Sequence, residues 1–349
     1  MSLTSYRAAP PRDKLWDAGC PARGRYLATD TRIGKSARHL FVTSHHTAVH
    51  RNVRLMSAEP ELDPRQPIGP SLVAIARAML AQAAHETRAE TDAIAIHGVR
   101  TAMKRWRAYL RLLEPFVGED GARLRLEARD LARGLAGARD AQSALDALSD
   151  FGEEYVPFSE KSLATITQRI EALRSSAESA TLKAGARERL ANAFALTVDN
   201  VERWALDHVT FKDIAESLTE GYRRVQHAIP PDWTSAEIED LHRLRQRVVI
   251  HRYQMELVKP MWPRLGRVWT QEAQRLRDRL GRHHDLAVLS GLAAPHQPLA
   301  RWRARLAPAI SARQADHIEA AMRQTGRLFA EKPKAFCRRL MALWAASGG

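Results

Sequence analysis

The chain has 349 residues, a formal net charge of +14 and an isoelectric point of about 10.3, and 45% of its residues are hydrophobic, which is enough for a packed core. So basic a balance favours an anionic partner, such as nucleic acid, anionic lipid or another polyanion, although an arginine-rich protein from a GC-rich genome shows the same total. No apolar run approaches the ~18 residues of a membrane span, and two cysteines provide neither a disulfide framework nor a zinc pattern, so we expect a cytoplasmic protein.

The first 70 residues differ in composition from the rest. Residues 1–70 are rich in proline and lack helical or strand periodicity, so we expect a disordered or loosely structured tail. Met56 is a more natural start, which raises the suspicion that residues 1–55 are an over-extended translation start. Beyond residue 70, Ala, Leu, Arg and Glu dominate, and this composition favours helix over strand.

Helical periodicity divides residues 71–349 into a series of helices, and no strand-hairpin signal interrupts them. The predicted helices are, in chain order, one with Ser71 as its N-cap, one ending near Pro115, one over about 119–149, long helices between about 159 and 207, one near 212–228, one ending at Pro260, one carrying residues 267–292, and two more split near Pro333. The fold class is therefore all-α.

The chain repeats itself at a single spacing of 145 residues. The repeated pairs are His97 with His242, Arg100 with Arg245, Arg107 with Arg252, Pro115 with Pro260 and Asp140 with Asp285, and apolar positions such as Leu112 and Leu257 accompany them. The spacing is too long for a solenoid, so it indicates a duplicated domain half. We predict two pseudo-symmetric helical bundles, over residues 71–210 and 211–349.

A row of basic side chains heads each copy of the repeat. In the first copy the steps of three and four residues place the whole row within roughly 80° of arc on one helix face, beside an apolar face that begins with Ile96 and Val99. The first row is His97, Arg100, Lys104, Arg107 and Arg111, and the second is His242, Arg245, Val249, Arg252 and Glu256. The second row is weaker as an anion site, because Val249 and Glu256 stand where the first has Lys104 and Arg111.

A solvated helix face is the plainer interpretation of one such row, but two related rows favour an anionic ligand. Arg243, Arg247 and His251 add charge on other faces of the second helix.

Two other functions share part of this pattern. A nucleic-acid binder would need aromatic side chains on the basic face, and Trp106 and Tyr109 lie off it. A metal-dependent phosphohydrolase could use His97, His242 and the run His283-His284-Asp285, but neighbouring arginines would repel a divalent cation. Asp140 and Asp285 are interpreted as structural partners of the histidines or as helix caps. We expect no catalytic residue, metal or cofactor.

The repeated motifs resemble those of the conserved histidine α-helical domain, the CHAD family. The family's H-x-x-R-V-x-x-R-R-x-R corresponds to HGVRTAMKRWR from His97, with departures at Thr101 and Lys104, and its L-G-x-x-R-D corresponds to Leu135 through Asp140, with Ala136 for Gly. In the second half, R-Y-x-x-E is met by Arg252, Tyr253 and Glu256, Val249 replaces a Lys, and L-G-x-x-x-D runs from Leu280 through Gly281 to Asp285.

The resemblance implies one CHAD domain over residues 71–349, built from two four-helix bundles, whose basic surface binds inorganic polyphosphate, and an association with polyphosphate granules. A fused triphosphatase domain is not implied, because Asp63 stands where its E-x-E-x-K marker requires Lys. Arginine forks suit the closely spaced phosphates of such a polymer. The predicted polyphosphate-binding residues are His97, Arg100, Lys104, Arg105, Arg107, Arg111, Arg139, His242, Arg245 and Arg252, and general polyanion or nucleic-acid binding is the alternative.

Overall fold

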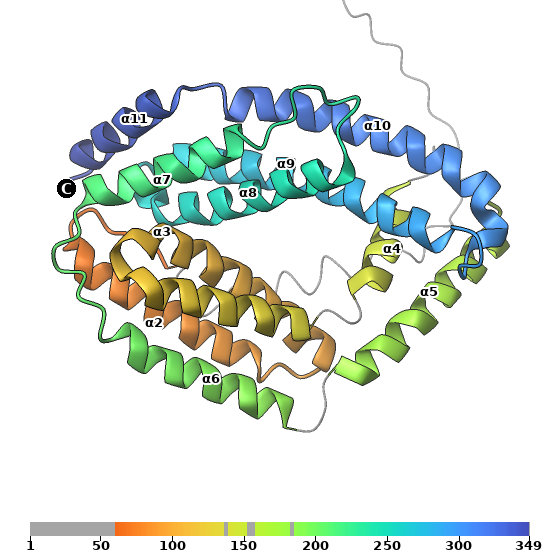
Figure 1. Cartoon of the computed structure of the whole chain (residues 1–349), viewed down its shortest axis with the longest axis horizontal. Helices are drawn as coiled ribbons and strands as arrows, with labels where there is room; N and C mark the ends of the chain where they lie inside the picture. Colours follow the sequence, from red (N-terminus) through yellow and green to blue (C-terminus); the bar gives the residue numbers. More distant parts are fainter. Residues whose placement is uncertain (1–59, 136–138, 152–157, 182–184, 349) are drawn as a thin grey trace, which may run out of the picture. The chain divides into compact units, whose positions relative to one another are not determined.

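The computed structural model describes residues 60–135, 139–151, 158–181 and 185–348 (Figure 1). These ranges are helical with connecting turns and contain no strand, so the predicted all-α class is confirmed. None of the helices in these ranges combines the length and the apolar character needed to cross a membrane. The expectation for residues 1–59 lies outside the described residues.

Ten α-helices and two 3₁₀ turns make up the described part of the chain. Those before residue 210 are α2 (Ile68–Glu86), α3 (Asp92–Gly134), α4 (Arg139–Asp150), α5 (Glu160–Thr181) and α6 (Ala186–Val201). Those after it are α7 (Phe211–Gln226), α8 (Ile238–Leu257), η1 (Lys259–Met261), α9 (Pro263–Leu292), η2 (Ala300–Trp302), α10 (Arg303–Leu328) and α11 (Pro333–Ala346).

The order of these helices repeats along the chain at about the predicted spacing. Shifted by 145 residues, α2 overlaps α7, α5 overlaps α10 and α6 overlaps α11, with bounds that agree to within five residues for the first pair and two for the others. Helix α3 corresponds in the same way to α8 followed by the first part of α9. The pseudo-symmetric arrangement of two bundles in space stays a prediction.

The helix end predicted near Pro115 is confirmed to within three residues, because the backbone leaves helical geometry at Gly118. The helix continues through Pro115 and bends at Gly118, whose φ of 56° and ψ of −133° suit glycine and strain other residues. The bend gives α3 a first leg, 92–117, and a second leg, 119–134. The single helix expected over 119–149 is therefore two, the second leg of α3 and α4.

Residues 60–70 were also misassigned to the loose tail. Leu62 is fully buried, and its backbone N–H donates to the carbonyl oxygen of Leu257 at 2.7 Å. Helix α2 already begins at Ile68, because Pro70 lies in a first helical turn, where its missing N–H costs no hydrogen bond. Ser71 is not the N-cap; its hydroxyl donates to the carbonyl oxygen of Pro67 at 2.7 Å.

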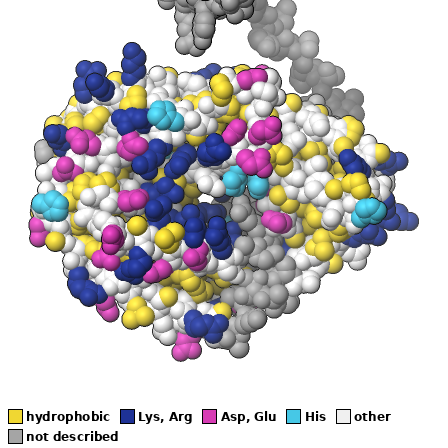
Figure 2. Space-filling view, viewed as in Figure 1, with side chains coloured by type: hydrophobic (Ala, Val, Ile, Leu, Met, Phe, Trp, Pro, Cys, Tyr) yellow, Lys and Arg dark blue, Asp and Glu magenta, His cyan; other side chains and the backbone are white. Residues whose placement is uncertain are grey.

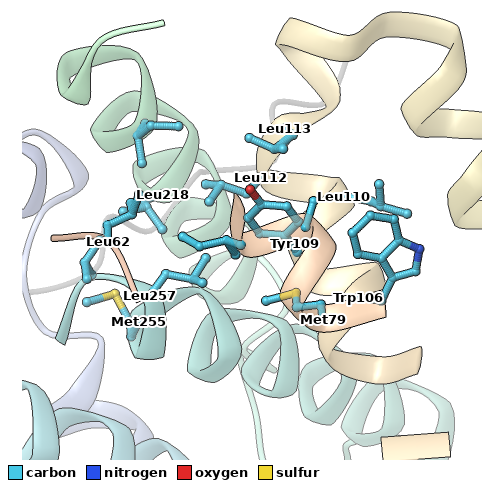
Figure 3. Close-up of a cluster of buried hydrophobic side chains, with 14 of the residues drawn as sticks. Leu62, Met79, Trp106, Tyr109, Leu110, Leu112, Leu113, Leu218, Met255 and Leu257 are labelled. Carbon is cyan, nitrogen blue, oxygen red and sulfur yellow. The ribbon is translucent and has the colours of Figure 1, made fainter. Parts of the chain in front are cut away.

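The main hydrophobic core joins helices from both predicted halves. Figure 3 shows side chains of α2, α3, α7 and α8 meeting in it, among them Met79, Tyr109, Leu218 and Leu257. Tyr109 is 1% exposed, and its hydroxyl donates to the carbonyl oxygen of Leu72 at 2.6 Å, so even the polar atom of this side chain is satisfied. Each large side chain buried here contributes about 1.5–3 kcal/mol of transfer free energy.

A second core lies where α4 and α5 pack with α9, η2 and α10. Beside it, the Asp150 carboxylate, 5% exposed, accepts hydrogen bonds from His317 Nε2 at 2.5 Å and Arg313 Nε at 3.0 Å, and Arg282 Nη1 lies 3.2 Å away. Burial alone would raise the pKa of Asp150, but the hydrogen bonds from His317 and Arg313 hold it below its ordinary value. Both cores thus take side chains from each side of the predicted boundary near residue 210.

Candidate functional site

The first leg of α3 packs against α8 and carries the first basic row. Thr91 starts this helix, since its hydroxyl oxygen accepts the N–H of Ile94 at 3.3 Å. The predicted apolar face is buried as expected, with Val99, Met103 and Trp106 in the main core, and this packing fixes the direction of the basic row. Figure 2 shows Lys and Arg side chains gathered in the middle of one face of the molecule, beside a hollow.

Arg100 and Arg245 both lie against neighbouring helix backbone. Arg100 Nη1 donates to the carbonyl oxygens of Ala132 at 3.2 Å and Leu135 at 2.9 Å, so it ties the first leg of α3 to the end of the second. The guanidinium of Arg245 lies over Gly281, where an added Cβ would be 3.4 Å from Arg245 Nε. This distance is an ordinary van der Waals contact, so the packing of Arg245 does not by itself require glycine at position 281.

A group of four side chains crosslinks α3 to α8, and we call it the clamp: Arg105, Arg252, Tyr253 and Glu256. The Glu256 carboxylate lies 2.5 Å from Arg252 Nη2 and 3.6 Å from Arg105 Nη2. Both guanidinium groups also lie over the ring of Tyr253, with Cζ at 5.5 Å for Arg105 and 4.6 Å for Arg252. Two predicted ligands are therefore already engaged with an acid and an aromatic ring.

Four other arginines form what we call the arginine cluster: Arg107 and Arg111 on the first leg of α3, Arg125 on the second leg, and Arg247 on α8. Arg125 Nη2 pairs with Glu114 at 3.3 Å. Within the described residues, by contrast, no ion pair joins Arg107, Arg111 or Arg247 to a carboxylate, although all three are half-buried.

The guanidinium groups of the arginine cluster repel one another. Burial, followed by the charges of Arg125 and Arg247, lowers the pKa of Arg111 to about 10. The pKa of Arg107 is lowered by burial and then by the positive charges on the second leg, Arg125 first. Burial also lowers the pKa of Arg247, and the positive charges of Arg224 and Arg243, which lie outside the arginine cluster, lower it further. All of these groups stay charged at neutral pH, and the single carboxylate of Glu114, which pairs with Arg125 and also acts on Arg111, offsets only part of their positive charge.

The remaining predicted ligands are less tightly defined. His97 is exposed and Lys104 is half-buried, and both lie on the first leg of α3. The ring of His242 lies 5.0 Å from that of His284, a neighbour that the sequence analysis did not assign to the anion site. Arg139 begins α4, but its side chain lies outside the described residues.

Arg125 and Arg247 belong to the basic site but were not among the residues predicted for it from the sequence. Arg247 is two residues from Arg245 and was placed on another face of its helix, which is correct, but that face meets Arg111 of α3. Arg125 reaches the same place because the chain turns back at Gly118. Its signal in the sequence is the glycine after Pro115, which marks a tight turn between two basic helices.

Three histidines are buried among the described residues: His251, His283 and His317. His251 is enclosed by aromatic rings, including Tyr222, Phe329 and Phe336, and burial lowers its pKa to about 3. Burial, with a smaller contribution from His317, lowers the pKa of His283 to about 4. His283 therefore points to the interior, apart from its neighbours His284 and Asp285, which are half-buried. In the described ranges, no three His, Cys, Asp or Glu side chains are grouped so as to hold a metal ion.

Comparison with known proteins gives both a fold and a family. The chain is similar to PptA from Streptomyces chartreusis, with 19% identity and a TM-score of 0.56 over 76% of this chain and 100% of that one. It is also similar to the CHAD domain from the plant Ricinus communis, with 18% identity and a TM-score of 0.46 over 81% of this chain and 94% of that one. No curated protein matches the chain. Residues 73–294 match the CHAD domain, and because this match spans more than half of the sequence, the chain belongs to the CHAD domain family.

Proposed function

We propose that this chain is a polyphosphate-binding module and that the polymer binds at the arginine cluster. The observation that carries the proposal is a set of three half-buried arginines, in which Arg111 is repelled by both Arg107 and Arg247 and none of the three forms an ion pair with a described carboxylate. Mutual repulsion destabilises such a cluster unless an anion neutralises it. Guanidinium groups chelate phosphate oxygens in pairs, so a row of phosphates complements this surface.

The buried aromatic residues favour a polymer without bases. Trp106 is 3% exposed and Tyr109 is 1% exposed, so neither can provide a platform on which nucleic-acid bases stack. Tyr253 is 7% exposed, and its ring is covered by two guanidinium groups of the clamp. Membership of the CHAD family supports polyphosphate over nucleic acid for the same surface.

We further propose that the module binds without catalysis and acts in the cytoplasm at polyphosphate granules. His283 is buried in a low-pKa environment, which removes one member of the His283-His284-Asp285 run from a surface site. Three arginines at the centre of the surface would oppose the approach of a divalent cation. Release of phosphate by purified protein with added Mg²⁺ or Mn²⁺ would contradict this part of the proposal.

The decisive experiment compares long-chain polyphosphate with double-stranded DNA of equal charge, at two salt concentrations. We expect the wild-type chain to prefer polyphosphate, and Arg107→Ala with Arg111→Ala to weaken binding by a factor on the order of 100, because each lost charge-assisted contact contributes about 1.5–3 kcal/mol.

The matched control is Arg264→Ala with Arg267→Ala, which removes two exposed arginines from the first turn of α9. This control should change affinity less than about 3-fold. Equal losses in the two double variants, or equal binding of DNA, would show that the charge acts only in a general way.

A further inference from the structure

We infer that Glu256 acts as a built-in counter-anion: it occupies Arg105 and Arg252, competes with polyphosphate for them, and so confines tight binding to the arginine cluster. The inference rests on the proposed function and adds a mechanism that limits the affinity of the site. Glu256 lowers the affinity for polyphosphate, whereas the arginines around it raise it.

The geometry of the clamp supports this role. The Glu256 side chain is 13% exposed, and its two partners are also largely covered, with Arg252 at 18% and Arg105 at 26%. Water screens a pair at this depth less than it screens a surface pair. One carboxylate thus faces two guanidinium groups and cancels half of their charge.

The repeat shows what the acid replaces. Glu256 lies 145 residues after Arg111, so the same position of the repeated row carries an acid on α8 and an arginine on α3. The consequence is visible in the partners: Arg252 has a carboxylate within one helical turn, whereas Arg107, its counterpart in the repeat, has none among the described residues. Together with Val249, which stands where the first row has Lys104, this acid makes the second row less positive than the first.

The two clamp arginines have supports other than Glu256. Arg252 Nη1 donates to Gln274 Oε1 at 2.5 Å, and Gln274 Nε2 in turn donates to both Asp278 carboxylate oxygens, at 2.7 and 2.9 Å. The Tyr253 ring holds both guanidinium groups by cation–π contact. Neutralising Glu256 therefore removes one negative charge from beside Arg105 and Arg252 while both stay oriented, so the affinity for polyphosphate should rise.

The test is Glu256→Gln, which removes the charge and keeps the shape. Its matched control is Glu272→Gln, which makes the same change in net charge at a half-buried acid of α9 that pairs with Arg275. Affinity for polyphosphate of one defined length is measured over a series of salt concentrations. We expect Glu256→Gln to tighten binding about 10-fold at low salt and to steepen the salt dependence by about one to two ions, while Glu272→Gln changes affinity less than about 3-fold.

A second variant decides the question if Glu256→Gln folds poorly by circular dichroism. Because Arg105 is already occupied by Glu256, Arg105→Ala should weaken binding less than about 3-fold, whereas Arg107→Ala should weaken it about 10-fold or more. Equal losses for these two variants would overturn the inference.

The outcomes separate the inference from the proposed function. If wild type binds polyphosphate and Glu256→Gln behaves like Glu272→Gln or binds more weakly, the inference is overturned and the proposed function stands. If only Glu256→Gln binds, the inference is supported and the proposed function of the natural chain is rejected. If neither protein binds, both are rejected.

Discussion

Two groups of arginines lie on the same pair of helices, α3 and α8, and they are built in opposite ways. In the clamp, Arg105 and Arg252 share an acid and an aromatic ring, so their charge is partly cancelled and they hold the helices together. In the arginine cluster, Arg107 and Arg111 face other arginines. A basic residue in the repeated motif thus becomes a crosslink or a candidate ligand according to whether a carboxylate lies beside it.

Copying the acid of the clamp into the arginine cluster should have the largest effect on binding. Arg111→Glu gives the first row the residue that Glu256 provides in the second, and the new carboxylate would neutralise Arg107 and Arg247. We expect polyphosphate affinity to fall on the order of 100-fold, since one contact is lost and a repulsion is added. Equilibrium binding at fixed salt measures the change.

Two controls accompany Arg111→Glu. Arg111→Gln removes the charge without adding an acid and should cost about 10-fold. Arg264→Glu makes the same reversal on the exposed first turn of α9 and should cost less than about 3-fold. Retention of wild-type affinity by Arg111→Glu would show that the polymer binds elsewhere.

Lowering the pH should reduce the stability of the fold without changing the charge of the clamp arginines or of the arginine cluster. The folded-state pKa of His251 is lowered to about 3 from an ordinary 6.5, so the unfolded chain binds a proton below about pH 6.5 that the folded chain refuses. The free energy of unfolding should therefore fall as the pH drops from about 6.5 toward 3, by about 2 kcal/mol between pH 7.5 and 5 from this group alone. The guanidinium groups keep their charge throughout this range.

His251→Leu tests the effect, because leucine fills a similar volume and cannot take up a proton. Urea denaturation at pH 7.5 and pH 5 should show a smaller acid loss in this variant than in wild type. His208→Leu, at an exposed histidine, is the control and should keep the wild-type slope. An unchanged acid loss in His251→Leu would assign the sensitivity to other groups, among which His283 comes first.

The smallest expected effects are on the free energy of unfolding, and they have opposite signs for the clamp and for the arginine cluster. Arg252→Ala removes hydrogen bonds to Gln274 and Glu256 and should lower the free energy of unfolding by about 1–2 kcal/mol. Arg247→Ala removes repulsion and should raise it by about 0.5 kcal/mol. Thermal or urea denaturation without added anions measures both, and a loss of stability in Arg247→Ala would contradict the repulsive character of the arginine cluster.

The helices, the repeat and the first basic row could be predicted from the sequence because they depend on local periodicity. The apolar face of α3 follows from the same spacing, and its residues are buried as expected. The composition of the site depends on tertiary contacts. The bend at Gly118 brings Arg125 beside Arg111, and the packing of α8 turns Arg247 toward the same point. The contact by which Glu256 bridges two helices could not be predicted from the sequence either, because Arg105 lies in the other half of the chain.

The second core has a consequence for how the chain is made. Helices α4 and α5 bury their apolar faces against the end of α9 and against α10, which are synthesised more than a hundred residues later. The hydrogen-bond partners of the buried Asp150, Arg313 and His317, are also synthesised late. A ribosome therefore releases the first half with an exposed apolar surface, and folding is completed only when the last third of the chain has emerged. Cutting the gene between the two halves would yield fragments that aggregate alone and regain structure only when they are produced together.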